Sequence, residues 1–140
     1  MDLFSRQIVG WAMDTAMTSQ LIIDAYRMTI ASRNIQPGLI LHSDRGVQYR
    51  SGEYQRELLS QGVISSMSRT GNCWDNAAME SFFARMKVES IHMHNFKGLD
   101  EAYSCVFEYI EIFYNRVRRH SANGFQSPAS FEEQYYAQSA

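Results

Sequence analysis

Residues 40–51 read ILHSDRGVQYRS, and here an apolar strand gives way to charge within a few residues. The apolar run at 39–41 is suited to a core, whereas the turn at 44–46 carries an aspartate, an arginine and a glycine. Predicted strands alternate with predicted helices along the chain, which indicates the α/β class. Ligands and catalytic groups collect at the carboxyl ends of strands in such sheets, so Asp44 is a candidate site residue.

Local patterns predict the elements on either side of this strand. Short runs rich in β-branched and aromatic residues predict strands at 7–13 and 39–42, and a weaker one at 63–68. Capping residues and helical spacing of apolar positions predict helices at about 18–33, 51–61, 75–89, 100–117 and from 127 onward. The stretch at 69–76, which contains Cys73 and Trp74, is predicted to be a loop.

Two of these helices carry apolar stripes that are expected to face a core. In the first helix the stripe consists of Met17, Leu21, Ala25 and Met28. In the fourth it consists of Tyr103, Val106, Phe107, Ile110, Phe113, Tyr114 and Val117. Asp75 and Asp100 are the expected N-caps of the third and fourth helices.

Composition indicates an ordinary soluble globular domain. The 140 residues are 45% hydrophobic and 20% charged, and we expect one domain at 1–136 with a tail at 137–140. Neither a membrane span nor a signal peptide is predicted. Cys73 and Cys105 lie far apart, which favours reduced thiols in a cytoplasm over a disulfide framework.

Charge leaves room for a local nucleic-acid contact but not for binding through bulk charge. The net charge is −2, which argues against a protein that coats nucleic acid. The densest basic patch consists of Arg116, Arg118 and Arg119, followed by His120. These arginines either contact phosphates or complement the dipole at the end of the fourth helix.

A second carboxylate, Glu80, lies near the start of the helix predicted at 75–89. Asn76 precedes it by four residues and Lys87 follows it by seven, so one helix face carries an amide, a carboxylate and an ammonium group. Mg²⁺ prefers oxygen ligands and usually takes only one or two carboxylates. Asp44 and Glu80 are therefore candidate metal ligands, although each also has an ordinary explanation, in a turn and at a helix N-terminus respectively.

Three motifs in order carry a family resemblance. LHSDRGVQY at 41–49, SMSRTGNCWDNAAMESFFARMK at 66–87 and YIEIFYNRVRRHSANGFQSPASFE at 109–132 cover much of the chain. They closely resemble the catalytic region of bacterial insertion-sequence transposases of the two-reading-frame (orfA/orfB) type, which are relatives of retroviral integrases. The resemblance implies a ribonuclease H-like integrase core, an α/β fold with a mixed sheet flanked by helices.

The family carries an aspartate–aspartate–glutamate triad whose last two acids have 35 residues between them. Positions 44 and 80 also leave 35 residues between them. By this resemblance Asp44 and Glu80 are the second and third catalytic acids and ligate Mg²⁺ or Mn²⁺. Asn76 and Lys87 match positions that approach DNA. The segment with Arg116, Arg118 and Arg119 matches the end of the family's domain, where its charge suggests phosphate contact or subunit packing.

The resemblance also implies partners and a location. DNA is the expected partner, as element ends and as target, together with self-association or association with full-length transposase. The expected location is the bacterial cytoplasm, with nucleoid association when DNA is bound. His42 is expected to lie beside the strand end and to form a hydrogen bond near the site.

The family's first aspartate precedes the segment that matches DLFSRQIVGW, at residues 2–11 here. We therefore expect a partial core that lacks the first strand and most of the second, with an unpaired strand edge at 7–13 and little strand transfer by the isolated chain. Two other functions stay open. One is a catalytically inactive remnant that binds DNA or full-length transposase, and the other is a ribonuclease H-like nuclease for RNA–DNA hybrids.

Overall fold

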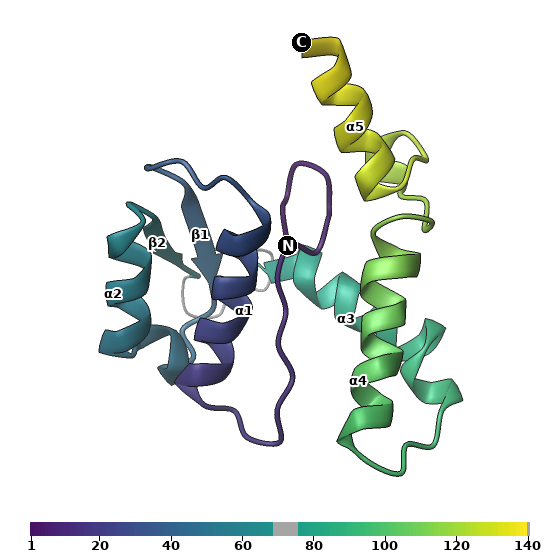
Figure 1. The fold of residues 1–140 in the computed structure, drawn as a ribbon, viewed down its shortest axis with the longest axis horizontal. Helices are drawn as coiled ribbons and strands as arrows, with labels where there is room; N and C mark the ends of the chain where they lie inside the picture. Colours follow the sequence, from purple (N-terminus) through teal and green to yellow (C-terminus); the bar gives the residue numbers. More distant parts are fainter. Residues whose placement is uncertain (69–75, 140) are drawn as a thin grey trace. The chain divides into compact units, whose positions relative to one another are not determined.

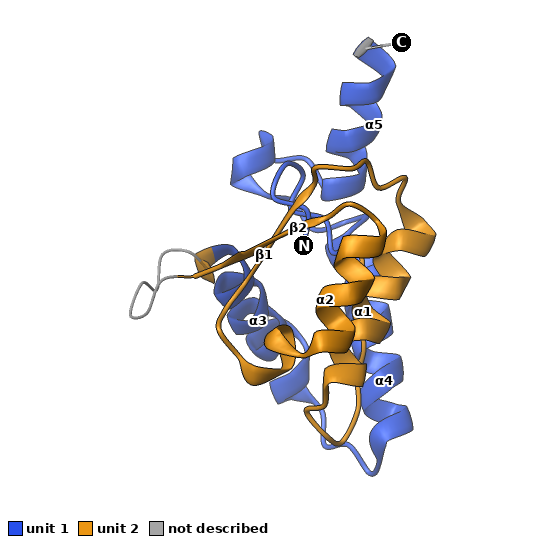
Figure 2. Ribbon diagram, turned by 90° about the vertical axis from the view of Figure 1, so that its left-hand side faces the viewer, with its two compact units in different colours: residues 1–8, 78–140 blue, residues 9–77 orange. Residues whose placement is uncertain are grey.

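The structure is a computed structural model that describes residues 1–68 and 76–139 (Figure 1). The chain forms two compact units. Unit 1 comprises Met1–Ile8 and Ala78–Ala140, and unit 2 comprises Val9–Ala77 (Figure 2). Cys73, Trp74 and the expected N-cap Asp75 lie outside the described residues. In the described part of the chain, every helix is too short or too polar to pass through a lipid bilayer.

Unit 2 is built on a short parallel sheet. Strand β1 (Ile40–Ser43) pairs with β2 (Ile64–Met67), and the register aligns Ile40 with Ile64 and Ser43 with Met67. The connection between the strands carries the short 3₁₀ helix η1 (Val47–Arg50) and helix α2 (Gly52–Ser60), as a parallel pair requires. The strands predicted at 39–42 and 63–68 are therefore confirmed, as is the helix predicted at 51–61.

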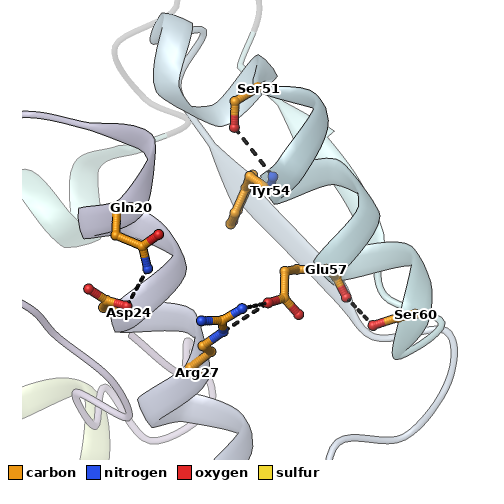
Figure 3. Close-up of polar contacts among 7 residues, drawn as sticks. All are labelled: Gln20, Asp24, Arg27, Ser51, Tyr54, Glu57 and Ser60. Atoms are coloured by element: carbon orange, nitrogen blue, oxygen red, sulfur yellow. Dashed lines mark hydrogen bonds and ion pairs between the residues drawn. The ribbon is translucent and has the colours of Figure 1, made fainter.

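Helices α1 (Ser19–Ser32) and α2 begin at side-chain caps. The hydroxyl of Thr18 accepts a hydrogen bond from the amide of Leu21 at 3.3 Å, and the hydroxyl of Ser51 accepts one from the amide of Tyr54. An ion pair between Arg27 of α1 and Glu57 of α2 joins the two helices, with Nε of Arg27 at 2.8 Å from Oε1 of Glu57 (Figure 3). Both helices were predicted from the sequence within a residue or two.

The core of unit 2 lies between these helices and one face of the sheet. Its buried members are Ile23, Tyr26, Tyr54, Leu58 and Val63, with Leu41 among the residues packed against them. The stripe predicted for the first helix is wrong, because Met17 precedes α1 and is 81% exposed. Of residues 39–41, which were expected to be buried, only Leu41 packs against the core, and it is partly buried. Alternate strand residues face opposite sides, and Ile40 and its partner Ile64 are 64% and 54% exposed.

The strand predicted at 7–13 is wrong, since this segment forms no regular element. Gly10 packs directly on α1, and a Cβ atom at this position would lie 2.3 Å from the carbonyl oxygen of Ala25. Ser32 donates its hydroxyl to the carbonyl of Val9, and the amide of Trp11 donates to the sulfur of Met28. The segment therefore uses a helix as its partner, and it does not present the unpaired strand edge that we expected.

Unit 1 is helical in its described part. It contains α3 (Ala77–Glu89) from its second residue onward, the 3₁₀ turn η3 (Ile91–Met93), α4 (Leu99–Phe107), the π-helix η4 (Glu108–Tyr114), the 3₁₀ turn η5 (Ser121–Asn123) and α5 (Pro128–Ser139). Gly98, and not Asp100, is the N-cap of α4. The last helix begins where Ser127-Pro128 predicted, and it continues through Ser139, beyond the expected domain end at 136.

The π-helix changes which residues of the fourth predicted helix are buried. Its wider turn is seen where the amide of Asn115 donates to the carbonyl of Ile110, five residues back, at 3.0 Å. Among the residues of the predicted stripe, Val106, Ile110 and Tyr114 are buried, as is the neighbouring Tyr109. The other four members are exposed: Tyr103, Phe107, Phe113 and Val117. The π-helix accounts for the exposure of Phe113 and Val117, because its period is longer than 3.6 residues. Tyr103 and Phe107 are exposed within the regular helix α4, so the stripe predicted for that part is wrong for a separate reason.

The first eight residues are an integral part of unit 1. Ser5 is fully buried and donates its hydroxyl to Oε1 of Glu132 at 2.6 Å. Its carbonyl accepts a hydrogen bond from Nδ2 of Asn123. The ring of Phe4 lies 5.1 Å from that of Phe131. Polar and aromatic contacts together hold this segment to α5 and to the turn before it.

Candidate metal and DNA site

Asp44 follows the last residue of β1, and its side chain is exposed. Its Oδ1 accepts a hydrogen bond from the amide of Gly46 at 2.8 Å, which sets the direction of the carboxylate. A Cβ atom at position 46 would lie 3.0 Å from that same oxygen and 3.0 Å from Oε1 of Gln48, so a larger residue would crowd the carboxylate. Arg45 donates Nε to the carbonyl of Ser68 at 2.8 Å. Each residue of the aspartate–arginine–glycine turn therefore has a separate geometric role.

Asn76 directly precedes α3 and is held at the same end of the sheet. Its Nδ2 donates to Oγ of Ser68 at 3.0 Å. His42 of β1 lies between two serines, with Nε2 at 3.0 Å from Oγ of Ser68 and Nδ1 at 3.0 Å from Oγ of Ser66. The expected hydrogen bonding of His42 near the strand end is confirmed. Sequence reasoning missed Ser66 and Ser68, because only the register of the parallel strands brings them to His42.

Glu80 and Lys87 are exposed residues of α3, in its first and last turns. Their spacing of seven places them two turns apart on one side of the helix. Glu80 belongs to unit 1, whereas Asp44 and Asn76 belong to unit 2. The pairing of Asp44 with Glu80 therefore stays a prediction.

The donor chemistry of these acids fits a hard divalent cation. Both carboxylates are exposed, and Mg²⁺ is commonly held by one or two carboxylates with water and substrate phosphate as further ligands. Across residues 1–68 and 76–139, no group of three or more histidine, cysteine, aspartate or glutamate side chains gathers as a metal cluster.

The three arginines of the basic patch differ in their surroundings. Arg116 and Arg119 are exposed. Arg118 instead forms a two-pronged ion pair with Glu89, with Nε at 2.8 Å from Oε2 and Nη2 at 2.7 Å from Oε1. Tyr109 donates its hydroxyl to the same carboxylate at 2.8 Å. Because two of its five N–H groups donate to Glu89, Arg118 has a structural role that competes with the predicted phosphate contact.

We expect this ion pair to make the free energy of unfolding depend on pH. The hydrogen bonds from Arg118 hold the pKa of Glu89 below the ordinary value of a glutamate. A carboxyl group with a lowered pKa stabilises the folded state above its unfolded pKa, and this contribution is lost as the pH falls through its folded pKa. We expect Glu89→Gln to lower the free energy of unfolding at neutral pH by about 1 kcal/mol, since the pair is partly exposed.

The measurement is urea unfolding at neutral pH and in acid. The difference between wild type and Glu89→Gln should shrink as the carboxyl group becomes protonated. Glu108→Gln is the matched control, because Glu108 is an exposed glutamate of the adjoining π-helix. A difference that stays constant down to acid pH would show that the carboxylate charge contributes nothing.

Comparison with known proteins now identifies the family. The family model of the integrase core domain matches residues 1–73, and a second integrase core model matches residues 61–128. By structure, the chain is similar to the catalytic core domain of BIV integrase, with a TM-score of 0.64 and 15% identity over 91% of this chain and 79% of that one. The expected ribonuclease H-like integrase fold is confirmed.

The curated relatives come from bacterial insertion elements. The insertion element IS600 uncharacterized 31 kDa protein of Shigella sonnei is 48% identical over 99% of this chain and 51% of its own length. The transposase for insertion sequence element IS904 of Lactococcus lactis is 46% identical over 94% and 52%. Transposase InsF for insertion sequence IS3A of Escherichia coli is 46% identical over 97% and 47%.

The chain thus spans about half the length of the curated relatives that it matches. These matches extend along nearly all of its residues and agree with the two family models. The expected resemblance is therefore confirmed: the chain is similar to insertion-sequence transposases, and it belongs to the integrase core domain family.

Proposed function

We propose that this chain contributes metal and DNA ligands to a transposase that cleaves DNA and joins DNA strands. The observation that carries the proposal is the exposed carboxylate of Asp44, oriented by Gly46 at the carboxyl end of β1. The position of such an acid at a strand end is typical of sites in α/β sheets. Cleavage and strand transfer are proposed for the whole protein, of which this core is a part.

In this proposal Asp44 and Glu80 hold Mg²⁺ or Mn²⁺. When bound, two such ions supply an activated nucleophile and stabilise the leaving oxygen of an in-line displacement. Asn76 and Lys87 contact the DNA end, and Arg116 and Arg119 contact phosphates farther along. Arg118 is proposed to act on DNA only indirectly, through its ion pair with Glu89. The proposed partners are DNA and either further copies of this chain or full-length transposase, and the proposed location is the cytoplasm, with nucleoid association when DNA is bound.

Removing either carboxylate should weaken cation binding by the 140-residue chain. We expect Asp44→Asn and Glu80→Gln each to lower the affinity for Mn²⁺ by at least about tenfold, because a two-carboxylate site loses half of its charge. Isothermal titration calorimetry with Mn²⁺, without and with a short DNA duplex, measures this. Asp100→Asn and Glu108→Gln are matched controls on exposed residues of unit 1.

Unchanged Mn²⁺ affinity in both variants would contradict the metal assignment. Incubation of the chain with duplex DNA and with an RNA–DNA hybrid then separates the other functions. Salt-dependent DNA binding that needs neither carboxylate would indicate a binding fragment without catalytic ligands. Cleavage of the hybrid without joining of DNA ends would indicate a nuclease.

A further inference from the structure

The hydroxyl of Ser68 is a meeting point of three segments of unit 2. Ser68 is 5% exposed and directly follows β2. Its Oγ lies 3.0 Å from Nε2 of His42, 3.0 Å from Nδ2 of Asn76 and 3.2 Å from the carbonyl oxygen of Ser43. Its backbone is also engaged, because its amide donates to the carbonyl of Ser43 at 2.9 Å and its carbonyl accepts from Arg45. The end of β1, the end of β2 and the start of α3 are therefore joined at one atom.

The donor and the acceptor of each hydrogen bond in this network can be assigned by counting the hydrogens and lone pairs of each group. A serine hydroxyl has one hydrogen and two lone pairs. The hydrogen goes to the carbonyl of Ser43, which is only an acceptor, and the lone pairs then accept from the amide of Asn76 and from His42. Nε2 of a neutral His42 therefore carries the ring proton, and Nδ1 accepts from the hydroxyl of Ser66. In this assignment every hydrogen bond has one donor and one acceptor.

We propose that Ser68, oriented by His42, is a positioning residue that holds Asn76 beside the end of β1 for contact with DNA. This inference rests on the proposed function, in which Asn76 contacts the DNA end. Among the described residues, Ser68 accepts from one of the two N–H groups of Asn76, and the side chain also carries a second N–H and a carbonyl oxygen with which it can bind a ligand. Ser43, the acceptor of Ser68, is the direct neighbour of Asp44.

The network thus couples the proposed DNA contact to the proposed metal ligand. Residues 43 and 44 share a peptide bond, so the hydrogen bonds to the carbonyl of Ser43 restrain the backbone that carries the Asp44 carboxylate. The Ser68 hydroxyl restrains both the Asn76 side chain and this peptide before DNA binds. Binding then has to restrict less conformational freedom of the protein, which lowers its entropic cost. Ser68 is a positioning residue in this scheme because it reaches DNA only through Asn76.

A double-mutant cycle on DNA affinity tests the proposal. The variants are Ser68→Ala, Asn76→Ala and the two combined, and the affinity for a short duplex is measured with Mn²⁺ present. We expect each single variant to weaken binding about fivefold, the loss of about one hydrogen bond, and the combined variant to bind no more weakly than Asn76→Ala. Ser68→Thr, which keeps the hydroxyl, should restore affinity. Fivefold effects that multiply in the combined variant would overturn the proposal.

Two further variants separate positioning from general damage. His42→Phe removes both ring nitrogens from an exposed position, so it tests the network without altering the core. It should weaken DNA binding, whereas His42→Gln should retain part of the affinity through its side-chain amide. Ser60→Ala is the matched control, since its hydroxyl donates to the carbonyl of Glu57 at the exposed end of α2. An equal loss of affinity in Ser60→Ala would overturn the assignment.

Nitrogen-15 NMR gives a readout that does not depend on DNA. At a pH where His42 is neutral, its long-range spectrum should show the proton on Nε2, and a proton on Nδ1 would overturn the network. The side-chain amide signals of Asn76 should shift in Ser68→Ala and stay in place in Ser60→Ala. Should the wild type fail to bind DNA, the proposed function fails, whereas shifted signals still support the positioning of Asn76 and unchanged signals overturn it.

Discussion

Gly10→Ala should lower the free energy of unfolding by about 3 kcal/mol. The added methyl group would lie 2.3 Å from the carbonyl oxygen of Ala25 and 2.9 Å from the amide nitrogen of Thr29. Both atoms belong to the backbone of α1, so no side-chain rotation relieves the overlap. The segment must move away from the helix, which also breaks the hydrogen bond from Ser32 to the carbonyl of Val9.

The measurement is urea unfolding followed by circular dichroism. Gly98→Ala is the matched control, because a methyl group there meets no atom within 4 Å and the backbone is extended. We expect its free energy of unfolding to change by less than about 1 kcal/mol, the small difference between glycine and alanine at a helix N-cap. Equal stability of Gly10→Ala and wild type would show that residues 9–11 do not pack on α1.

Asn115→Ala should lower the free energy of unfolding by about as much as Gly10→Ala. The cause here is the loss of hydrogen bonds to buried polar groups, whereas in Gly10→Ala it is steric overlap. The side chain of Asn115 accepts a hydrogen bond from the amide of Ile8 at 2.9 Å and donates one to the carbonyl of Ile8 at 3.0 Å. Both residues are buried, so alanine would leave two backbone groups of Ile8 without partners. Each unsatisfied buried group costs about 1–3 kcal/mol, which predicts a loss of about 3 kcal/mol.

Two variants make this prediction specific. Asn115→Asp keeps the acceptor for the amide of Ile8 but turns a second oxygen toward the carbonyl, so it should also destabilise the protein. Asn95→Ala alters an exposed asparagine outside the helices and should stay within about 0.5 kcal/mol of wild type. Hydrogen exchange of the Ile8 amide provides a local measurement, and unchanged protection in Asn115→Ala would contradict the proposed role.

Local sequence patterns correctly predicted helices and strands that are stabilised by residues close to them in the chain. Helices α1 and α2 begin at Thr18 and Ser51, and these hydroxyls cap residues only three positions away. Strands β1 and β2 were predicted from short runs of apolar and β-branched residues. The two strands pair in parallel, and one helical connection joins them. The acid at the end of β1 was likewise found from the change from apolar to charged residues.

The error at residues 7–13 originates in partners that are remote along the chain, and part of the error in the fourth predicted helix originates in its local geometry. The segment at 7–13 has the composition of a strand, but Gly10 allows a helix backbone to approach where a strand was expected. The backbone amide and carbonyl of Ile8 form hydrogen bonds with the side chain of Asn115, 107 positions away, where a strand would use the backbone of a neighbouring strand. In the fourth predicted helix, the π-helix changes the period after Phe107, which accounts for the exposure of Phe113 and Val117 but not for that of Tyr103 and Phe107.

The order of motifs and the 35 residues between Asp44 and Glu80 were enough to place the chain in its family, since these are properties of the chain alone. Only the tertiary structure decided three other features. These are the face of the sheet that packs on the helices, the pairing of Arg118 with Glu89, and the hydrogen bond between Ser68 and Asn76. His42 meets Ser68 across 26 positions, and Arg118 meets Glu89 across 29. Such contacts arise from strand register and helix packing, so they cannot be predicted from a local pattern of residues.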